Sequence, residues 1–324
     1  MPTGNEPVGD TEFAACAKLT EQSDYRGLCA GLLQGFAALA PAMHAALLEV
    51  YDDRGQTPWQ QVELEHLLVR HVPTLANQPQ PAWLAEGVAA SPAHGEVSLL
   101  ERDDCVVFCL GGLNGLWRFI EIRRCPSPAI HASVHRLTLI FANLMRLFDR
   151  FERDPLTGLF NRQSFENRFA DLLEYQQQNP SRDHRSDGMW LAIADIDHFK
   201  RVNDTYGHLF GDEILLLVSQ IMRQSFRFED LLFRYGGEEF IIILNKTDEA
   251  GARLALERFH AAVRAYEFPR LRQLTISIGW ATVLSREFSS DVIHKADKAL
   301  YYAKDNGRDQ VVSFEELADD PAGE

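Results

Sequence analysis

Apolar residues along the first part of the chain follow two kinds of spacing. Helical spacing, with apolar residues three and four positions apart, covers residues 27–40 and 60–72. Short apolar runs that read as strands cover residues 43–51, 105–110 and 116–122. Between them, residues 73–94 contain several prolines and little periodicity, which predicts a loop with short helical pieces. We expect helix, strand, acidic turn, irregular middle and closing hairpin, in that order.

A connector with a heptad period follows. Its apolar positions are spaced alternately four and three residues apart: Ile130, Val134, Leu137, Phe141, Leu144, Phe148 and Phe151. A strict seam of this kind favours a two-stranded parallel coiled coil. The alternative is one amphipathic helix lying on its own domain. Pro155 ends the helix, and Asn161 is the expected N-cap of the next one.

The second half of the chain alternates strands and helices. Strands are predicted at residues 190–196, 231–235, 240–244, 274–283 and 310–314. Helices are predicted at residues 212–226, 249–265 and 292–304. This order predicts an α+β domain with a mixed sheet flanked by helices.

Length and charge narrow the functional classes. A chain of 324 residues with 46% hydrophobic residues is long enough for two domains with separate cores. The net charge of −15 argues against nucleic acid as a standing partner. There is no membrane-spanning run and no signal-peptide pattern, so we expect a soluble, cytoplasmic protein without a membrane partner. The five cysteines are too scattered for a disulfide scaffold.

Candidate chemistry begins in the turn between the second and third of these strands. Gly236-Gly237-Glu238-Glu239 separates two apolar runs, which predicts a hairpin whose turn carries carboxylates. The glycines would let a ligand approach the backbone. The alternative is an ordinary acidic hairpin.

A second pair of acids ends an apolar strand. Asp195 and Asp197 follow residues 190–194, and alternation places both on the same side of the strand. Asp195 together with Glu238 would make an oxygen site for Mg²⁺, which binds carboxylates and substrate phosphates. Lys200 is close enough in sequence to reach the same phosphates.

These residues resemble the GGDEF domain of diguanylate cyclases, with Glu at the third motif position. The resemblance covers about residues 152–316 and rests on several motifs in the same order. The motifs are Asp154-x-Leu156-Thr157-Gly158-Leu159-x-Asn161-Arg162, Asp195-Ile196-Asp197-His198-Phe199-Lys200, Asn203-Asp204-x-x-Gly207-His208-x-x-Gly211-Asp212, Gly236-Gly237-Glu238-Glu239-Phe240 and Asp297-x-Ala299-Leu300-Tyr301-x-Ala303-Lys304-x-x-Gly307-Arg308. It implies a nucleotidyl-cyclase-like, palm-like fold.

The resemblance also implies a reaction and a set of residue roles. Two GTP molecules would become cyclic di-GMP and two pyrophosphates, with Mg²⁺ or Mn²⁺, in a homodimer whose two sites face each other. Asp195, the carbonyl of Ile196 and Glu238 would hold the metal; Glu238, Glu239 and Lys200 would take part in catalysis. The remaining GTP contacts would be Asn203, His208, Asp212, Gly236, Gly237, Lys304 and Arg308.

Two of these roles leave alternatives open. Asp212 would accept the guanine N–H donors, but it could also be the N-cap of its helix. Arg227 and Asp230 lie at the register of the family's inhibitory product site, where cyclic di-GMP would bind. Their alternative is a surface ion pair.

The first half resembles a GAF-type sensory domain in its pattern of elements alone. The expected segments are an N-terminal segment 1–23, a GAF-like sensor 24–126 with an unknown ligand, a linker helix and dimer contact 127–153, a catalytic domain 154–316 and an acidic tail 317–324. Two rival functions are a non-catalytic receptor for GTP or cyclic di-GMP and a dinucleotide synthase of different base specificity. Asp195, Glu238 and Lys200 argue against the first, and Asp212 argues against the second.

Overall fold

The chain forms two compact units. In this computed structural model they comprise Met1–Phe151 and Glu152–Glu324. The structure describes residues 8–22, 24–52, 67–72, 77–92, 96–113, 116–125, 127–178, 188–227, 229–271, 273–284 and 287–318. No helix within those ranges has the length and apolar character needed to span a bilayer.

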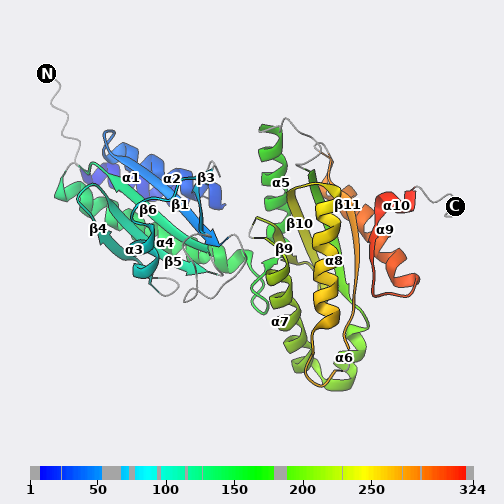
Figure 1. Cartoon of the computed structure of the whole chain (residues 1–324). Coiled ribbons are helices and arrows are strands. Elements are labelled where there is room, and N and C mark those ends of the chain that lie inside the picture. The colour runs from blue at the N-terminus through cyan, green and yellow to red at the C-terminus, as the bar shows by residue number, and fades with distance from the viewer. Residues whose placement is uncertain are drawn as a thin grey trace. The chain divides into compact units, whose positions relative to one another are not determined.

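The N-terminal unit is built on a six-stranded antiparallel sheet in the order β3-β2-β1-β6-β5-β4. The strands are β1 (His44–Asp52), β2 (Leu67–Val72), β3 (Asn77–Gln78), β4 (Ser98–Glu101), β5 (Val106–Leu113) and β6 (Leu116–Arg123). The helices are α1 (Val8–Thr20), α2 (Tyr25–Leu39), α3 (Leu84–Ala90) and α4 (Pro128–Glu152). Figure 1 labels these elements, apart from β2.

Alternation along the strands separates two cores. Leu47, Phe108 and Ile120 face α1, α2 and α4, where Leu32 and Phe36 complete the cluster. The opposite face is covered by α3. Its buried residues include Leu48, Val50, Trp83, Val107 and Phe119.

Most of the predicted elements of this unit are confirmed, and one is wrong. The helix at 27–40, the strand at 43–51 and the hairpin of residues 105–122 appear as α2, β1 and β5–β6. The helix predicted at 60–72 is wrong where the structure describes it, because residues 67–72 form β2 and pair with β1. Leu67 and Val69 alternate inward on that strand, a period that the helical interpretation overlooked. Residues 60–66 lie outside the described ranges.

Helix α4 corresponds to the predicted linker, and its seam packs inside the unit. Val134, Leu137 and Phe141 have no exposed surface and belong to the core shared with α1 and α2. The alternative of one amphipathic helix on its own domain therefore describes these positions, and the coiled coil is wrong there. Their burial leaves them no surface for a partner helix. Near the end of α4, Phe151 is 72% exposed.

A buried charge network joins the sheet to the last turns of α4. Glu49, on the central strand β1, accepts hydrogen bonds from Tyr25, from Arg70 at 2.7 Å and from Arg118 at 3.4 Å. Arg118 also donates to Asp149 of α4 at 2.9 Å. Burial alone would raise the pKa of Glu49, but Arg70 and Arg118 outweigh it and lower the pKa to about 2.

The C-terminal unit has a mixed sheet, as predicted, and its strands lie in the order β12-β11-β8-β10-β9-β7. Its strands are β7 (Phe160–Asn161), β8 (Gly188–Ile196), β9 (Leu231–Arg234), β10 (Glu239–Thr247), β11 (Ile276–Thr282) and β12 (Val311–Ser313). Its helices are α5 (Arg162–Gln178), α6 (Phe199–Tyr206), α7 (His208–Ser225), α8 (Glu249–Ala265), α9 (Ser289–Asp305) and α10 (Phe314–Ala318). The β11–β12 and β7–β9 pairs are parallel, and the others are antiparallel.

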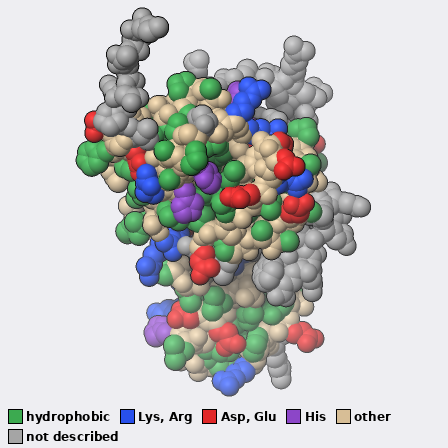
Figure 2. Space-filling model, turned by 90° about the vertical axis from the view of Figure 1, so that its left-hand side faces the viewer, with side chains coloured by type: hydrophobic (Ala, Val, Ile, Leu, Met, Phe, Trp, Pro, Cys, Tyr) green, Lys and Arg blue, Asp and Glu red, His purple; other side chains and the backbone are tan. Residues whose placement is uncertain are grey.

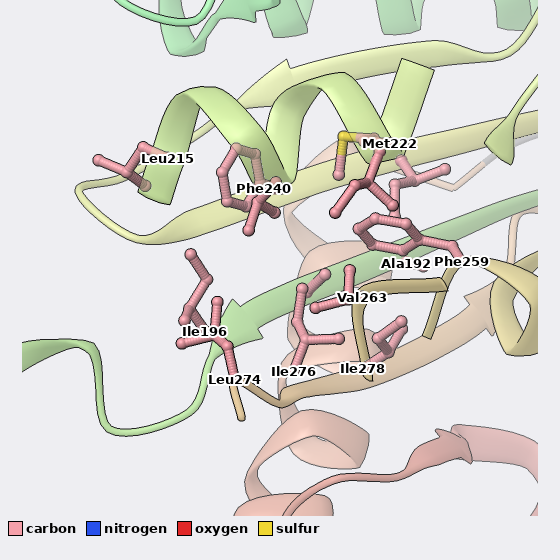
Figure 3. Close-up of a cluster of buried hydrophobic side chains, with 14 of the residues drawn as sticks. Ala192, Ile196, Leu215, Met222, Phe240, Phe259, Val263, Leu274, Ile276 and Ile278 are labelled. Atoms are coloured by element: carbon pink, nitrogen blue, oxygen red, sulfur yellow. The ribbon is translucent and has the colours of Figure 1, made fainter. Parts of the chain in front are cut away.

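Helices cover both faces of this sheet. Helices α7 and α8 lie on one face (Figure 1), and Figure 3 shows their side chains Met222, Phe259 and Val263 meeting Phe240 and Ile278 of the sheet. Helices α5 and α9 cover the other face. Gly279 permits close packing of α9, since a Cβ there would lie 2.0 Å from the amide nitrogen of Leu300.

Sequence patterning located the strands of this unit better than its short helices. The hairpin at 231–244 is confirmed as antiparallel β9 and β10, and Asn161 caps α5 by accepting from the Ser164 amide at 3.0 Å. Helix α6 was missed, and α7 begins at His208 rather than Asp212. Gly207, at a φ of 86°, separates the two helices.

Charged side chains of both signs lie on the surface. On the face shown in Figure 2, Lys and Arg side chains are interspersed with acidic and apolar ones.

The network around Glu49 leads to a prediction on stability. Glu49→Gln should lower the free energy of unfolding at neutral pH by about 3–5 kcal/mol, because two buried guanidinium groups lose their anionic partner. The folded pKa of about 2 lies below the ordinary value of 4.5, so the stabilisation is complete above the ordinary value and is lost as pH falls through the folded one. The difference in the free energy of unfolding between wild type and variant, measured by urea titration, should therefore shrink as the pH falls from 4.5 to about 2.

Glu101→Gln is the matched control, because Glu101 is exposed on β4 of the same sheet. It should change the unfolding free energy by less than about 0.5 kcal/mol. A Glu49→Gln difference that stays constant with pH would contradict the charge-pairing explanation.

Candidate active site

The register between β8 and β10 brings the predicted acids together. Glu239 lies directly opposite Asp195 in the antiparallel pair, and the amide of Ile196 donates to the carbonyl of Glu238 at 3.4 Å. Asp195 is the penultimate residue of β8, and Glu238 immediately precedes β10. Four residues named from sequence, Asp195, Ile196, Glu238 and Glu239, therefore lie at one end of the sheet.

Three carboxylates and one ammonium group determine the electrostatics here. Asp195 is 6% exposed, and its Oδ1 lies 2.9 Å from Nζ of Lys304 on α9. Burial raises the pKa of Asp195; Lys304 opposes this effect, and Glu239 adds to it. Burial also raises the pKa of Glu238, with the charge of Asp195 as the next cause. The site therefore holds more negative charge than one lysine balances.

This surplus suits a divalent cation. Within the described ranges, no set of three or more His, Cys, Asp or Glu side chains is close enough to form a metal cage by itself. Mg²⁺ does not require such a cage, because it commonly binds one or two carboxylates and takes its other ligands from water and substrate phosphates. Asp195, Glu238 and the carbonyl of Ile196 fit this pattern of hard oxygen donors.

The two turn glycines have different surroundings. The amides of Tyr235 and Gly236 donate to the carbonyl of Glu239 at 2.9 and 3.2 Å, which closes the hairpin. A Cβ on Gly236 would lie 2.5 Å from Glu239 Oε2, whereas a Cβ on Gly237 would meet nothing within 4 Å. Gly236 thus leaves room for the Glu239 carboxylate, and exposed Gly237 leaves backbone open to a ligand.

Arg234 anchors this turn and was missed in the sequence. Its guanidinium donates to the carbonyl of Gly237 at 3.0 Å and to both oxygens of Asp154, at 3.1 and 3.2 Å. Asp154 also accepts from the amide and hydroxyl of Thr157. Burial raises the pKa of Asp154, but the Thr157 and Arg234 contacts outweigh it and lower the pKa. An arginine two residues before a pair of glycines was the available signal.

The predicted base-reading residues lie on α6 and α7. Lys200, His208 and Asp212 are exposed, and Asn203 is partly buried. Asp212 is the fifth residue of α7, so its alternative role as N-cap is wrong. Gly211 was named only as a motif member, with no role of its own, although a Cβ there would lie 1.9 Å from Oδ1 of Asn203. Its lack of a side chain lets Asn203 lie against α7.

Asp197, unlike Asp195, is fully engaged with protein groups. It is 5% exposed and accepts hydrogen bonds from the hydroxyls of Thr275 and Ser277, both at 2.7 Å, and from the amide of Asp309 at 3.1 Å. Ser277 is also the cross-strand neighbour of Asp195. The two acids therefore lie on the same side of the sheet, as predicted, but Asp197 joins β11 to the segment after α9.

Arg308 lies in that segment with an exposed side chain and a φ of 62°. Its amide donates to the carbonyl of Ala303 at 2.9 Å, which keeps the segment close to the end of α9. Lys304 lies one turn earlier on that helix and contacts Asp195. The two predicted phosphate contacts are thus supplied by the end of α9.

Arg227 and Asp230 form a local turn before β9. Asp230 accepts a hydrogen bond from the backbone amide of Arg227 at 2.8 Å, and the guanidinium of Arg227 is exposed. Burial raises the pKa of Asp230 to about 6, partly opposed by Arg227. The carboxylate therefore has a structural role in this turn, which differs from the surface ion pair considered above.

Comparisons with known proteins concern the C-terminal half. Residues 151–310 match the family model described as diguanylate cyclase, GGDEF domain. Diguanylate cyclase DgcP of Pseudomonas aeruginosa is 41% identical over 162 residues, which are 49% of this chain and 23% of that protein. Diguanylate cyclase A of Treponema denticola is 34% identical over 184 residues, or 55% of this chain and 48% of that protein. The chain thus spans less than half the length of either relative.

A solved structure matches the same region. The coiled coil and GGDEF domain of DgcB from Caulobacter crescentus, in complex with c-di-GMP, superposes with a TM-score of 0.50 and 26% sequence identity. The match covers 57% of this chain and 97% of that one.

Arg234 provides a test of how the turn is held. Arg234→Ala should lower the free energy of unfolding by about 1–3 kcal/mol, because the part-buried Asp154 carboxylate loses a charged partner. Amide hydrogen exchange in residues 236–239 should become faster, because the Gly237 carbonyl loses its anchor. Arg201→Ala, at an exposed position of α6, is the control and should change neither quantity. Unchanged exchange in Arg234→Ala would show that the turn is held by other contacts.

Proposed function

We propose that this chain condenses two GTP molecules into cyclic di-GMP and two pyrophosphates, because residues 151–310 match the family model of the diguanylate cyclase GGDEF domain. The observation that carries the proposal is the group formed by Asp195, Glu238 and Glu239 beside Lys304. An acidic cluster with a nearby lysine is the arrangement needed to hold a metal-bound triphosphate.

Asp195, the carbonyl of Ile196 and Glu238 would hold the Mg²⁺ or Mn²⁺ ion. When bound, such an ion neutralises charge on phosphate oxygens and orients the reacting phosphate. Lys304 would contact the outer phosphates together with Arg308. Its ammonium already neutralises Asp195, so nucleotide binding would redistribute this contact. Lys200 would stabilise charge that develops on the phosphate under attack.

Base selection would depend on α6 and α7. Asn203 and Asp212 would recognise guanine, because its N1–H and N2–H₂ groups donate hydrogen bonds that a carboxylate accepts. His208 would lie beside the base or ribose. Adenine lacks donors at these positions, so a site with these acceptors should reject ATP strongly. Gly236 and Gly237 would lie against the nucleotide.

The reaction requires two sites. The 3′-hydroxyl of one GTP attacks the α-phosphorus of the other; the new O–P bond replaces the bond to pyrophosphate, and the step occurs twice. Glu238 would accept the hydroxyl proton, helped by the burial that raises its pKa, and Glu239 would support it. Each chain would present one GTP, so the active form would be a homodimer. Leu147 and Phe151, exposed near the end of α4, are where two linker helices would meet.

Regulation would come from two sources. The N-terminal unit would act as a GAF-like sensor for an unidentified ligand and would pass its state to the catalytic unit through α4. Arg227 would bind cyclic di-GMP as an inhibitory product, helped by Asp230. The exposed guanidinium of Arg227 is free to bind a phosphate or guanine edge while its backbone amide holds Asp230.

A nucleotide incubation tests the proposed reaction. With Mg²⁺ and GTP, the wild-type chain should form cyclic di-GMP, detected by chromatography, and ATP should give no cyclic product. Glu238→Gln and Asp195→Asn should each reduce the rate by about 10²-fold or more, because both remove charge from the reacting centre. Glu257→Gln, at an exposed position of α8, should keep the wild-type rate. GTP binding without cyclic di-GMP would favour a receptor, and turnover of ATP would favour a synthase of different specificity.

Substitution of Gly237 tests whether this glycine faces the nucleotide or supports the fold. Gly237→Ala should leave the unfolding temperature unchanged, because a Cβ there meets no protein atom within 4 Å. It should weaken GTP binding about tenfold, because the added methyl group would occupy the space in which the nucleotide lies against the protein backbone. Calorimetric titration and thermal unfolding provide the two measurements. Unchanged GTP affinity would place the nucleotide away from this turn.

A further inference from the structure

The segment after α9 has an unusual backbone. Gly307, Arg308 and Asp309 have φ values of 109°, 62° and 50°. Asp and Gly tolerate this left-handed region, but a long side chain such as that of Arg308 adopts it rarely. Such a conformation persists where surrounding contacts stabilise it.

Asp309 provides those contacts through both its backbone and its side chain. Its amide donates to Oδ2 of Asp197 at 3.1 Å. Its Oδ1 lies 2.9 Å from Nε2 of His260, and its Oδ2 lies 3.3 Å from Nη1 of Arg264, both on α8. Nε2 of His260 and Oδ1 of Asp309 are both buried, and within the described ranges neither makes a hydrogen bond, so each is the nearest polar atom that the other can pair with. One residue therefore joins the segment to α8 and to the end of β8.

The other end of this network is rigid. Asp197 is buried and also accepts from Thr275 and Ser277, so its carboxylate is fixed relative to β11. It lies two residues after Asp195. The network thus ties the position of Asp309 to the strand end that carries the acidic cluster.

We propose that Asp309, held by His260, Arg264 and Asp197, is a positioning residue that directs Arg308 toward the triphosphate. The inference rests on the proposed function, in which Arg308 binds the outer phosphates. Arg308 is exposed, so its backbone sets only the point from which the side chain starts and thus the region that its guanidinium can reach. That backbone is held by the adjacent Asp309. Fixing a cation before the substrate arrives reduces the entropy lost on binding.

A positioning residue and a purely structural residue have different expected effects on nucleotide binding. A positioning residue for Arg308 should affect ligands with outer phosphates and leave ligands without them unaffected. A structural anchor would affect all nucleotides and thermal stability together. The pair of probes is 3′-deoxy-GTP, which lacks the attacking hydroxyl and cannot turn over, and GMP, which lacks the outer phosphates.

Asp309→Gly is the decisive variant, because glycine adopts positive φ freely while the contacts to His260 and Arg264 are lost. It should weaken 3′-deoxy-GTP binding about tenfold, the scale of one charged hydrogen bond, with GMP binding unchanged. Asp309→Asn should retain most of the affinity, because asparagine tolerates positive φ and its carbonyl still accepts. His260→Ala, which leaves the sequence of the segment unchanged, should likewise weaken 3′-deoxy-GTP binding and not GMP binding. Glu257→Gln on α8 is the control.

A double variant separates failure of this inference from failure of the proposed function. Arg308→Ala should weaken 3′-deoxy-GTP binding, and adding Asp309→Gly to it should cause little further loss, because Asp309 acts through Arg308. Full additivity, or equal losses for GMP and 3′-deoxy-GTP in Asp309→Gly, would overturn the positioning role. If Arg308→Ala itself leaves 3′-deoxy-GTP binding unchanged, the proposed phosphate contact is wrong, and the inference fails with it.

Discussion

The antiparallel register of β8 and β10 is the constraint on which the rest of the C-terminal unit depends. It places Glu239 opposite Asp195 and sets Glu238 beside the amide of Ile196. A shift by one residue would turn Asp195 to the opposite face of the sheet, away from Lys304. The fully buried Ile241, Ile242 and Ile243 of β10 hold the register, since they fill both cores. Packing in the sheet thus keeps like charges close together at its end.

Sequence patterning predicted the parts of the molecule that strong alternation determines. Strands β8, β10 and β11 are nearly continuous apolar runs, and the acids at the end of β8 and the start of β10 were recognisable as a group. Patterning failed where a short segment fits two periods, as in β2. It also failed at α6, which follows a left-handed His198 and has only eight residues. Local spacing carries little information about such breaks.

The candidate site was predictable in its members and less so in their contacts. Lys304 was expected at phosphates, and in the structure its ammonium group pairs with Asp195. From the sequence, Asp197 could not be told apart from Asp195. In the structure its carboxylate oxygens accept hydrogen bonds from the hydroxyls of Thr275 and Ser277, which are about 80 residues away in the sequence. Arg234 and Gly211 act through neighbours that only the folded chain brings close. Sequence indicates which chemistry is present, whereas the tertiary fold decides which partner each group finds.

The packing of α4 has a mechanical consequence. Since Val134, Leu137 and Phe141 are inserted in the core of their own unit, the helix cannot spin about its axis without withdrawing three large side chains, at a cost of several kcal/mol. Helix α4 is therefore anchored in the core of its own unit and does not rotate independently of it. As long as this core stays intact, the buried part of α4 moves only together with the N-terminal unit, and any displacement that it transmits to residue 152 is a rigid-body movement of that unit.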